Sequence, residues 1–293
     1  MKRFYLLFAV SLAALVSFAQ SSVVGGVEEN AAEEPVGSNP ITLNASFGMG
    51  ATSTANHYIG THECSGATIG VHADLGRFYK SWEDVSWNLS FDYVSSVDKV
   101  GSLESFAKTS SMKYSSTSLN YNSSYNWRFG NNFMVKAGGG VDFVFDMTEE
   151  LGYRTNNAVS MNVLAQLEAS AGLSYVFQFK KWMLGLYGGL SVPFMGIAYS
   201  DSKHETGLPT DGLLNKYDSH LKGTSFSNLQ GIDCDFGVKF IMKRVTLGVG
   251  IASNNRWWCV NDIQNYRKNT FFQVGLSFNL VSLKQTNTIH RYF

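Results

Sequence analysis

Acidic side chains at alternating positions are the residues of this sequence that point most directly to chemistry. Asp74, Asp142, Glu168, Asp233 and Asp235 each lie on the polar side of a segment in which apolar and polar residues alternate. Because successive side chains of a β-strand point to opposite faces, the five carboxylates are expected on one inner face of a sheet. Carboxylates that crowd together attract cations. The sequence therefore predicts a lumen with affinity for small cations.

Few opposing cations are predicted on this face. They are mainly Lys136 and Lys239, and His72 is a titratable neighbour. The face predicts either a cation-preferring pore or a plug of salt bridges and hydrogen bonds. The plug is favoured, because ten strands enclose little space once side chains fill it. The predicted lumen-lining residues are His72, Asp74, Lys136, Asp142, Glu168, Asp233, Asp235 and Lys239.

Histidines in the polar segments between the strands suggest a second kind of chemistry. His57, His62, His204 and His220 lie there, beside several Asp and Glu residues. A His and acid pair can activate a water molecule, as in ten-stranded proteases of the omptin type. A rim hydrolase, either an omptin-like protease or a lipid hydrolase, is therefore the alternative function, although no omptin motif is present. The sequence favours a non-enzymatic protein and assigns it no catalytic residue, metal or cofactor.

Two cysteines and two tryptophans lie in segments predicted as long loops. Barrel closure would bring the first and last of these loops together, so Cys64 and Cys259 are expected either to form a disulfide or to stay as two thiols. Trp257 and Trp258 precede Cys259 directly. They predict either an exposed patch that docks a glycan or a protein, as in a surface-binding or adhesion barrel, or part of an aromatic girdle at the membrane edge.

Composition limits the class of protein. Lys plus Arg number 23 and Asp plus Glu number 23, so the formal charge is zero. Nucleic acid is excluded as an expected partner, because no basic stripe is present to bind phosphates. Charged residues make up 16% of the chain, against about 25% in typical soluble domains, and Gly is frequent with 28 residues. This mixture favours a β-rich protein that faces lipid.

The N-terminus predicts export. Lys2 and Arg3 precede an apolar run over residues 4–16, and small residues follow before Gln20. This pattern is typical of a cleaved signal peptide, here residues 1–19. Residues 20–40 carry four Glu and no basic residue, which predicts a flexible acidic periplasmic leader. No later run is long and apolar enough for a membrane-spanning helix, which needs about 20 residues.

From residue 41 onward the dominant signal is a hydrophobic period of two. Between Val159 and Phe177 every odd position is apolar and most even positions are polar, whereas a helical face drawn from Val159 is half polar. Strands of this length are typical of tilted strands that cross a bilayer. The predicted strands are residues 41–51, 67–79, 82–93, 114–127, 133–148, 159–177, 182–199, 226–240, 245–252 and 270–280.

Two features predict that the apolar face points outward into lipid. Short links, at 80–81, 128–132, 178–181 and 241–244, alternate with long ones, and aromatic residues flank three of the four short links. Aromatic rings at strand ends are typical of the membrane interface, and short periplasmic turns opposite long extracellular loops are typical of outer-membrane barrels. The polar face carries too many ionisable groups for a dry core. We therefore predict an all-β fold, a transmembrane up-and-down antiparallel β-barrel of about ten strands over residues 41–283.

The last predicted strand carries a further pattern. Gln273, Gly275, Phe278 and Leu280 match the spacing of the insertion signal on terminal barrel strands. With the signal peptide and ten amphipathic strands, the chain resembles the small outer-membrane β-barrel proteins of Bacteroidota, many of them functionally uncharacterised. One departure is the tail, 284–293 beyond the predicted barrel, because such chains usually stop near the signal strand.

The resemblance implies a multi-pass protein of the cell outer membrane. Its expected partners are outer-membrane lipid and, through the last strand, the barrel-assembly machinery, and a monomer is expected. The function that follows is a structural role, or a narrow passive passage for small polar solutes or cations.

Overall fold

The computed structural model describes ten segments of the chain: residues 41–56, 63–78, 85–100, 111–130, 132–150, 159–179, 182–200, 221–242, 245–260 and 263–279. The predicted signal peptide (1–19), leader (20–40) and tail (284–293) lie outside these residues. The strands are β1 (Ile41–Asn56), β2 (Glu63–Phe78), β3 (Val85–Val100), β4 (Ser111–Phe129), β5 (Phe133–Glu150), β6 (Val159–Gln178), β7 (Met183–Ser200), β8 (Leu221–Ser225), β9 (Leu229–Ile241), β10 (Val245–Val260) and β11 (Ile263–Asn279).

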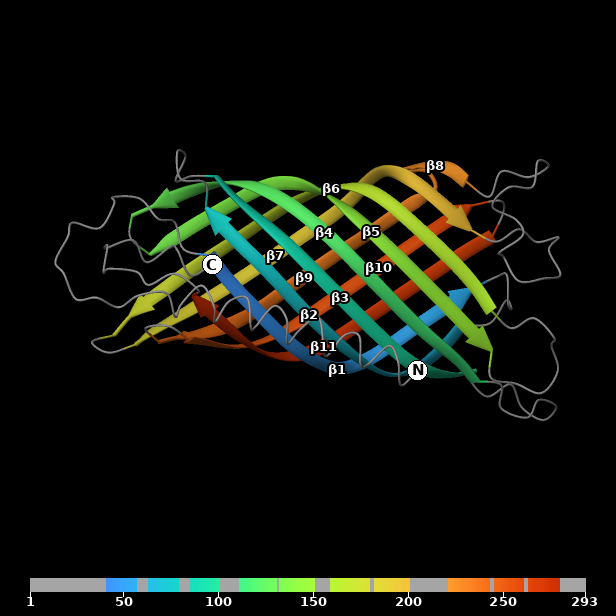
Figure 1. Cartoon of the computed structure of the whole chain (residues 1–293), viewed down its shortest axis with the longest axis horizontal. Helices are drawn as coiled ribbons and strands as arrows, with labels where there is room; N and C mark the ends of the chain where they lie inside the picture. Colours follow the sequence, from blue (N-terminus) through green and yellow to red (C-terminus); the bar gives the residue numbers. More distant parts are fainter. Residues whose placement is uncertain are drawn as a thin grey trace, which may run out of the picture.

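These strands form a closed antiparallel barrel (Figure 1). Each strand pairs with its neighbours in the order β6-β5-β4-β3-β2-β1-β11-β10-β9-β7, and β6 also pairs with β7. β8 and β9 share one position in this wall, because β7 pairs with β9 along one part of its length and with β8 along another. The prediction of a ten-membered transmembrane barrel is confirmed. No helix in the described part of the chain is long and apolar enough to cross a membrane.

The last described strand closes the barrel. β11 pairs with β1 from Thr42 opposite Asn279 to Asn56 opposite Asn265. The predicted strand 270–280 is therefore the final described strand, despite the tail that follows it.

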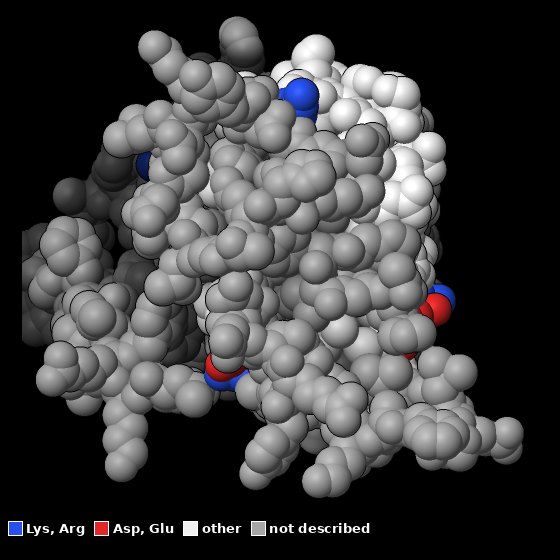
Figure 2. Space-filling model, turned by 90° about the vertical axis from the view of Figure 1, so that its right-hand side faces the viewer, with Lys and Arg blue, Asp and Glu red and all other residues white. Residues whose placement is uncertain are grey.

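The wall has its apolar side outward, as the period of two predicts. On β6, Leu164 and Glu168 point inward with at most 4% of their surface exposed, whereas Leu173 on the opposite face is 54% exposed. Phe47, Phe236 and Phe272, on three other strands, are also about half exposed on the outside. In the view onto the long-loop end, the outer wall that can be seen is mostly uncharged (Figure 2). The fold thus exposes large apolar side chains and buries polar ones.

Aromatic rings cluster where the strands meet the short turns. The ring centroids of Tyr175 and Phe177 lie 4.8 Å apart, and Trp182 stacks on both Phe179 and Phe240 at 4.0 and 4.8 Å. At one of these turns Gly130 has φ = 66°, a conformation that side chains other than Gly rarely adopt. These rings form the interfacial girdle expected of the short-turn end.

The strands extend further than predicted at the long-loop end. β10 continues to Val260 and β11 begins at Ile263, so most of the predicted loop 253–269 is a hairpin. Likewise β1 reaches Asn56 and β3 reaches Val100. The reason is that outward positions there, such as Ser253 and Asn255 on β10, are polar like the inward ones, so the alternation that marks a strand disappears.

The eighth predicted strand is also corrected. Residues 226–228 form a turn instead of the start of a strand, and β8 lies in the predicted loop 200–225.

Two buried clusters close the lumen. Near the long loops, six lumen-facing residues pack together, each with at most 3% exposure: Val144, Leu164, Ala198, Leu229, Trp258 and Val260, called here the apolar cap. Near the short turns, Met134, Val176 and Ile241 have no exposed surface. The polar cavity lies between these clusters.

Candidate functional site

The lumen holds a cavity of about 560 Å³. It extends from Thr42 and Arg77, near the short-turn ends of β1 and β2, to Arg256 and Arg267 towards the long loops. The wall of this cavity includes all eight of the residues predicted for the lumen: His72, Asp74, Lys136, Asp142, Glu168, Asp233, Asp235 and Lys239.

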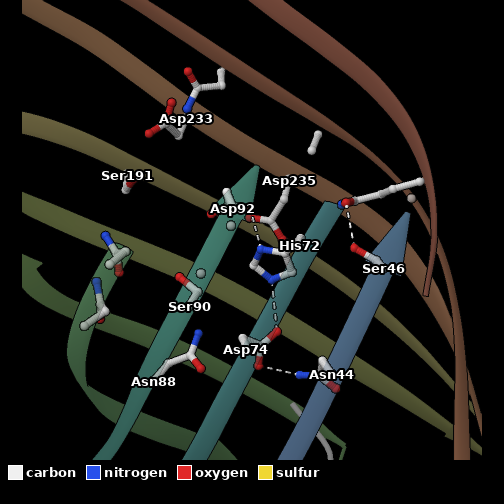
Figure 3. A pocket seen from close by; sticks show the side chains of 18 of the residues that line it. Asn44, Ser46, His72, Asp74, Asn88, Ser90, Asp92, Ser191, Asp233 and Asp235 are labelled. Atoms are coloured by element: carbon white, nitrogen blue, oxygen red, sulfur yellow. Dashed lines mark hydrogen bonds and ion pairs between the residues drawn. The ribbon is translucent and has the colours of Figure 1, made fainter. Parts of the chain in front are cut away.

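His72 lies between two carboxylates at mid-height in this cavity (Figure 3). Its Nδ1 is 2.6 Å from Asp92 on β3, and its Nε2 is 3.0 Å from Asp74 on its own strand. Asn44 on β1 donates to Asp74 at 2.6 Å. Because a carboxylate can only accept, both ring nitrogens donate at once only when both carry a proton. The cluster ties β1, β2 and β3 together on one side of the cavity.

Arg256 crosses the lumen. Its Nη1 lies 2.9 Å from Asp142 on β5, and its Nη2 bonds Asp233 on the adjacent strand β9. Gln166 donates to the same oxygen of Asp142 at 2.7 Å. β10 and β5 are separated around the wall by β9, β7 and β6. The guanidinium, 3% exposed, therefore bridges distant walls of the barrel.

Arg267 forms a second bridge. It extends from β11 to Asp146 on β5 at 2.7 Å, between strands that face each other across the ring of ten. Tyr114 on β4 also donates to Asp146, at 2.9 Å, while Arg267 donates to Ser116 and Asn254 at 2.9 and 2.8 Å. Both ion-pair partners have at most 5% exposed side chains. Bridges of this kind fill the cross-section that an open pore would need.

A third polar contact passes over β5. Asn120 on β4 donates to Glu168 on β6, although β5 lies between these strands. Gly140 lies opposite Asn122 on β4 and opposite Glu168 on β6, and an added Cβ there would lie 2.2 Å from the carbonyl oxygen of Tyr121. The missing side chain permits this close approach of the backbones.

Two lysines lie on the short-turn side of the cavity. Lys239 lies 4.9 Å from the ring centroid of Tyr187. The ammonium group of Lys136 forms no ion pair or hydrogen bond with any other residue in the ten described segments. Asp235 lines the same cavity. The Lys136 charge therefore lacks a direct bridge to the described part of the wall, in contrast to the two arginines.

Sequence reasoning missed the two arginines. Arg256 and Arg267 lie in the segment predicted as the last loop, so the expectation that Lys136 and Lys239 are the main lumen cations is wrong. The sequence did contain a signal for Arg256. Every second residue of β10 faces the lumen, and Ala252, Asn254 and Arg256 continue this series. Asp146, on the polar side of β5, had the right parity but was not among the predicted site residues.

Of the two outcomes left open for Cys64 and Cys259, the structure has the free thiols. Cys64 and Cys259 are both among the described residues, and no disulfide joins them. β1 and β11 lie between their strands, β2 and β10, in the wall. Cys64 is fully buried, while Cys259 follows the inward-facing Trp258 and points the other way. The two cysteines, which were predicted to lie in neighbouring loops, are thus at distant positions in the barrel wall.

The predicted tryptophan patch is corrected as well. Trp257 and Trp258 are consecutive residues of β10, so their side chains point to opposite faces of the wall. Trp258 is 3% exposed and belongs to the apolar cap. A paired Trp surface is therefore absent from the described strand, and the surface-binding interpretation loses its basis there.

The histidines that suggested a rim hydrolase lie outside the described residues. They are His57, His62, His204 and His220, so the structure gives no geometry for such a site. Among the residues it does describe, no group of three or more His, Cys, Asp or Glu is arranged to hold a metal ion.

Comparison with known proteins gives a family and a fold. Residues 5–287 match the model of the family described as "Protein of unknown function (DUF3316)". A search of the curated proteins finds no match.

Among solved structures, the outer membrane protease OmpT from Escherichia coli is similar at 9% identity and a TM-score of 0.49, over 86% of this chain and 99% of that one. The translocator domain of the autotransporter NalP from Neisseria meningitidis is similar at 12% identity and 0.43, over 92% and 97%. Neisserial surface protein A is similar at 10% identity and 0.35, over 82% and 96%. At such identities the likeness does not extend to activity.

Proposed function

We propose that this chain, which belongs to the family described as a protein of unknown function (DUF3316), forms an outer-membrane barrel whose lumen is closed to ions at rest. Its role is structural, with a narrow passage for small cations that conducts only when the arginine bridges are released. The observation that carries this proposal is the pair of guanidinium groups that cross the lumen to carboxylates on distant strands.

The preference for cations follows from the charges that line the lumen. Seven described carboxylates face it, against five Lys and Arg side chains that line it, so an unbridged lumen would hold net negative charge. The carboxylates are Asp74, Asp92, Asp142, Asp146, Glu168, Asp233 and Asp235, and the cations are Arg77, Lys136, Lys239, Arg256 and Arg267.

The outer wall supports placement in a membrane. Its exposed side chains include Phe47, Phe236 and Phe272, and aromatic rings gather at the short-turn end. The ring of strands closes on itself, so most backbone groups of the described wall are paired, as a membrane-spanning sheet requires. The proposed partners are outer-membrane lipid and the assembly machinery that would recognise Gln273, Gly275 and Phe278 on β11.

Planar-bilayer conductance tests the proposal. The wild-type chain should give no stable current steps. A fourfold variant, Arg256→Ser and Asp142→Ser with Arg267→Ser and Asp146→Ser, removes both bridges, and the remaining Asp233 is partly exposed, so no fully buried charge is left without its partner. It should give small steps that carry cations in preference to anions.

A matched control removes an ion pair from the same region of the wall but on its outer side. Lys113 on β4 and Glu149 on β5 are 3.9 Å apart, and Lys113→Ser with Glu149→Ser should be as silent as the wild type. Stable open-channel currents from the wild-type chain would overturn the proposal. So would a bridge variant that folds, as judged by heat-modifiable migration, yet stays silent.

A further inference from the structure

The barrel wall is interrupted between β7 and the position shared by β8 and β9. β7 pairs with β9 up to Ser191 opposite Asp233, and with β8 again from Met195 opposite Ser225. Between these rungs three residues of β7, 192–194, face seven residues of the other side, 226–232. No backbone pairing joins them within the described chain. We call these two stretches the seam.

The residues of the seam explain why the ladder breaks. Pro193 has no backbone N–H to donate, and the pairing of β7 with β6 shifts register at the same place. Gly231 lies against Pro193, since an added Cβ there would be 3.2 Å from the Pro193 Cγ. Asn228 holds the turn opposite, accepting from Ser225 N at 2.8 Å and from Cys259 N at 2.9 Å. The seam is therefore held by side-chain packing and a local turn.

The outer side of the seam carries several apolar side chains beside the exposed Ser227 and Gln230. The rings of Phe194 and Phe226 lie 6.4 Å apart across it, and Phe226 is 62% exposed. Met195 and Ile232, at its two ends, are 48% and 41% exposed. These side chains continue the apolar outer wall, so the seam opens towards lipid chains.

The inner side of the seam is apolar only towards the long loops, because Gly231, further along β9, lies against the Cγ of Arg256. Leu229 of the seam is fully buried and belongs to the apolar cap, together with Trp258 and Ala198. Trp258 lies opposite Leu229 in the ladder. Its indole N–H is buried and has no hydrogen-bond partner among the described residues. An apolar region with one unused donor thus lies directly behind the only break described in the wall.

From this juxtaposition we infer that the seam is a lateral access site for an acyl chain of a membrane lipid. The chain passes between Phe194 and Phe226 and contacts Trp258 and Leu229, and an ester carbonyl can accept from the indole N–H. Opening breaks no ladder hydrogen bonds, so its cost is the packing of a few side chains. This inference is independent of whether the lumen conducts ions.

Quenching of tryptophan fluorescence by brominated lipid tests the inference. In a variant with Trp258 as the sole tryptophan, the other five being replaced by Phe, the protein is placed in phosphatidylcholine vesicles with brominated or ordinary acyl chains. Bromine quenches only near contact. Trp258 should therefore lose emission in the brominated vesicles even though it lies inside the barrel. Equal emission in both vesicles would overturn the inference.

A disulfide across the seam provides the decisive control. Pro193→Cys with Gly231→Cys, in a chain whose natural cysteines are replaced by Ala, should restore the emission of Trp258 when oxidised and lose it again on reduction. A matched disulfide between Leu186→Cys and Val238→Cys, on an intact rung of β7 and β9, should leave the quenching unchanged. Quenching that persists with the seam oxidised would contradict lateral access.

Two further measurements test whether the quenching comes from access through the seam. A sole tryptophan at Phe271, a lumen residue of β11 that is 8% exposed, should not be quenched, and equal quenching there would mean that bromine reaches the whole lumen. In the unmodified chain, backbone amides of 229–232 should exchange with deuterium faster than those of 233–241. Equal protection would show that the seam stays closed and would overturn the inference.

Discussion

The two halves of the lumen handle buried charge in different ways. Towards the long loops, Arg256 and Arg267 each bind carboxylates on distant strands, and the arginine side chains are at most 5% exposed. Towards the short turns, Lys136 and Lys239 line the other end of the same cavity of about 560 Å³, and neither lysine is fully buried. A dry region tolerates charge only when it is paired, whereas a region with room for water does not impose that condition. The first half holds the barrel together, and the second leaves space.

The largest expected effect comes from breaking the bridge of the dry half. Arg256→Ala leaves Asp142 and Asp233 without their cation, and loss of one partner of a buried pair costs about 4 kcal/mol of the free energy of unfolding. Urea titration of the protein in lipid vesicles measures this.

The control for this bridge is a charge on the outer side of the wall. Lys113→Ala should change the free energy of unfolding by about 0.5 kcal/mol or less, because the pair it forms is partly exposed. Equal effects of the two substitutions would erase the contrast between lumen and surface charge.

A second test addresses the apolar cap. Leu164→Ala removes a side chain that is 1% exposed and should cost about 3 kcal/mol through the cavity it leaves. Leu167→Ala, on the same strand but 40% exposed towards lipid, should cost less, because lipid fills the space. The same titration compares them, and a larger loss for Leu167 would indicate that the cap is loosely packed.

The histidine cluster should show an intermediate effect. His72→Ala removes hydrogen bonds to Asp74 and Asp92, yet the imidazole is 34% exposed and water can replace it. We expect a loss of about 1.5 kcal/mol in the free energy of unfolding. The Asp92→Asn variant tests the coupling: the double variant should lose less than the sum of the two single variants. Strict additivity would show that the 2.6 Å contact contributes little.

The same contrast explains what the sequence could predict. Within the lipid belt the outer wall must be apolar, so the alternation on β6 identifies both the strand and the inward direction of Glu168. Beyond Ala252 the outward positions of β10 include Ser253 and Asn255, so both faces of the strand are polar there and Arg256 reads as part of a loop. The arginine bridges were therefore hidden in the region where the physical cause of the pattern ends.

Contacts between distant strands were unpredictable for a different reason. The parity of Asp142 shows that it faces the lumen, but not which strand faces it across the barrel. That depends on the register between every neighbouring pair of strands, which a period of two leaves open. The pairing of Arg256 with Asp142 and the separation of Cys64 from Cys259 both follow from register.

The smallest expected effect belongs to the hydrated half and is the sharpest test of the comparison. Lys136 lines the cavity with Lys239, and its ammonium group forms no ion pair or hydrogen bond with the other described residues. Lys136→Met keeps the length of the side chain and removes one of two like charges, so the free energy of unfolding should change by no more than about 0.5 kcal/mol. Urea titration of this variant and of Arg256→Ala gives the ratio of their losses in the free energy of unfolding. A loss near that of Arg256→Ala would mean that the lysine has a partner as essential as those of the arginines, and the two halves of the lumen would then follow one rule.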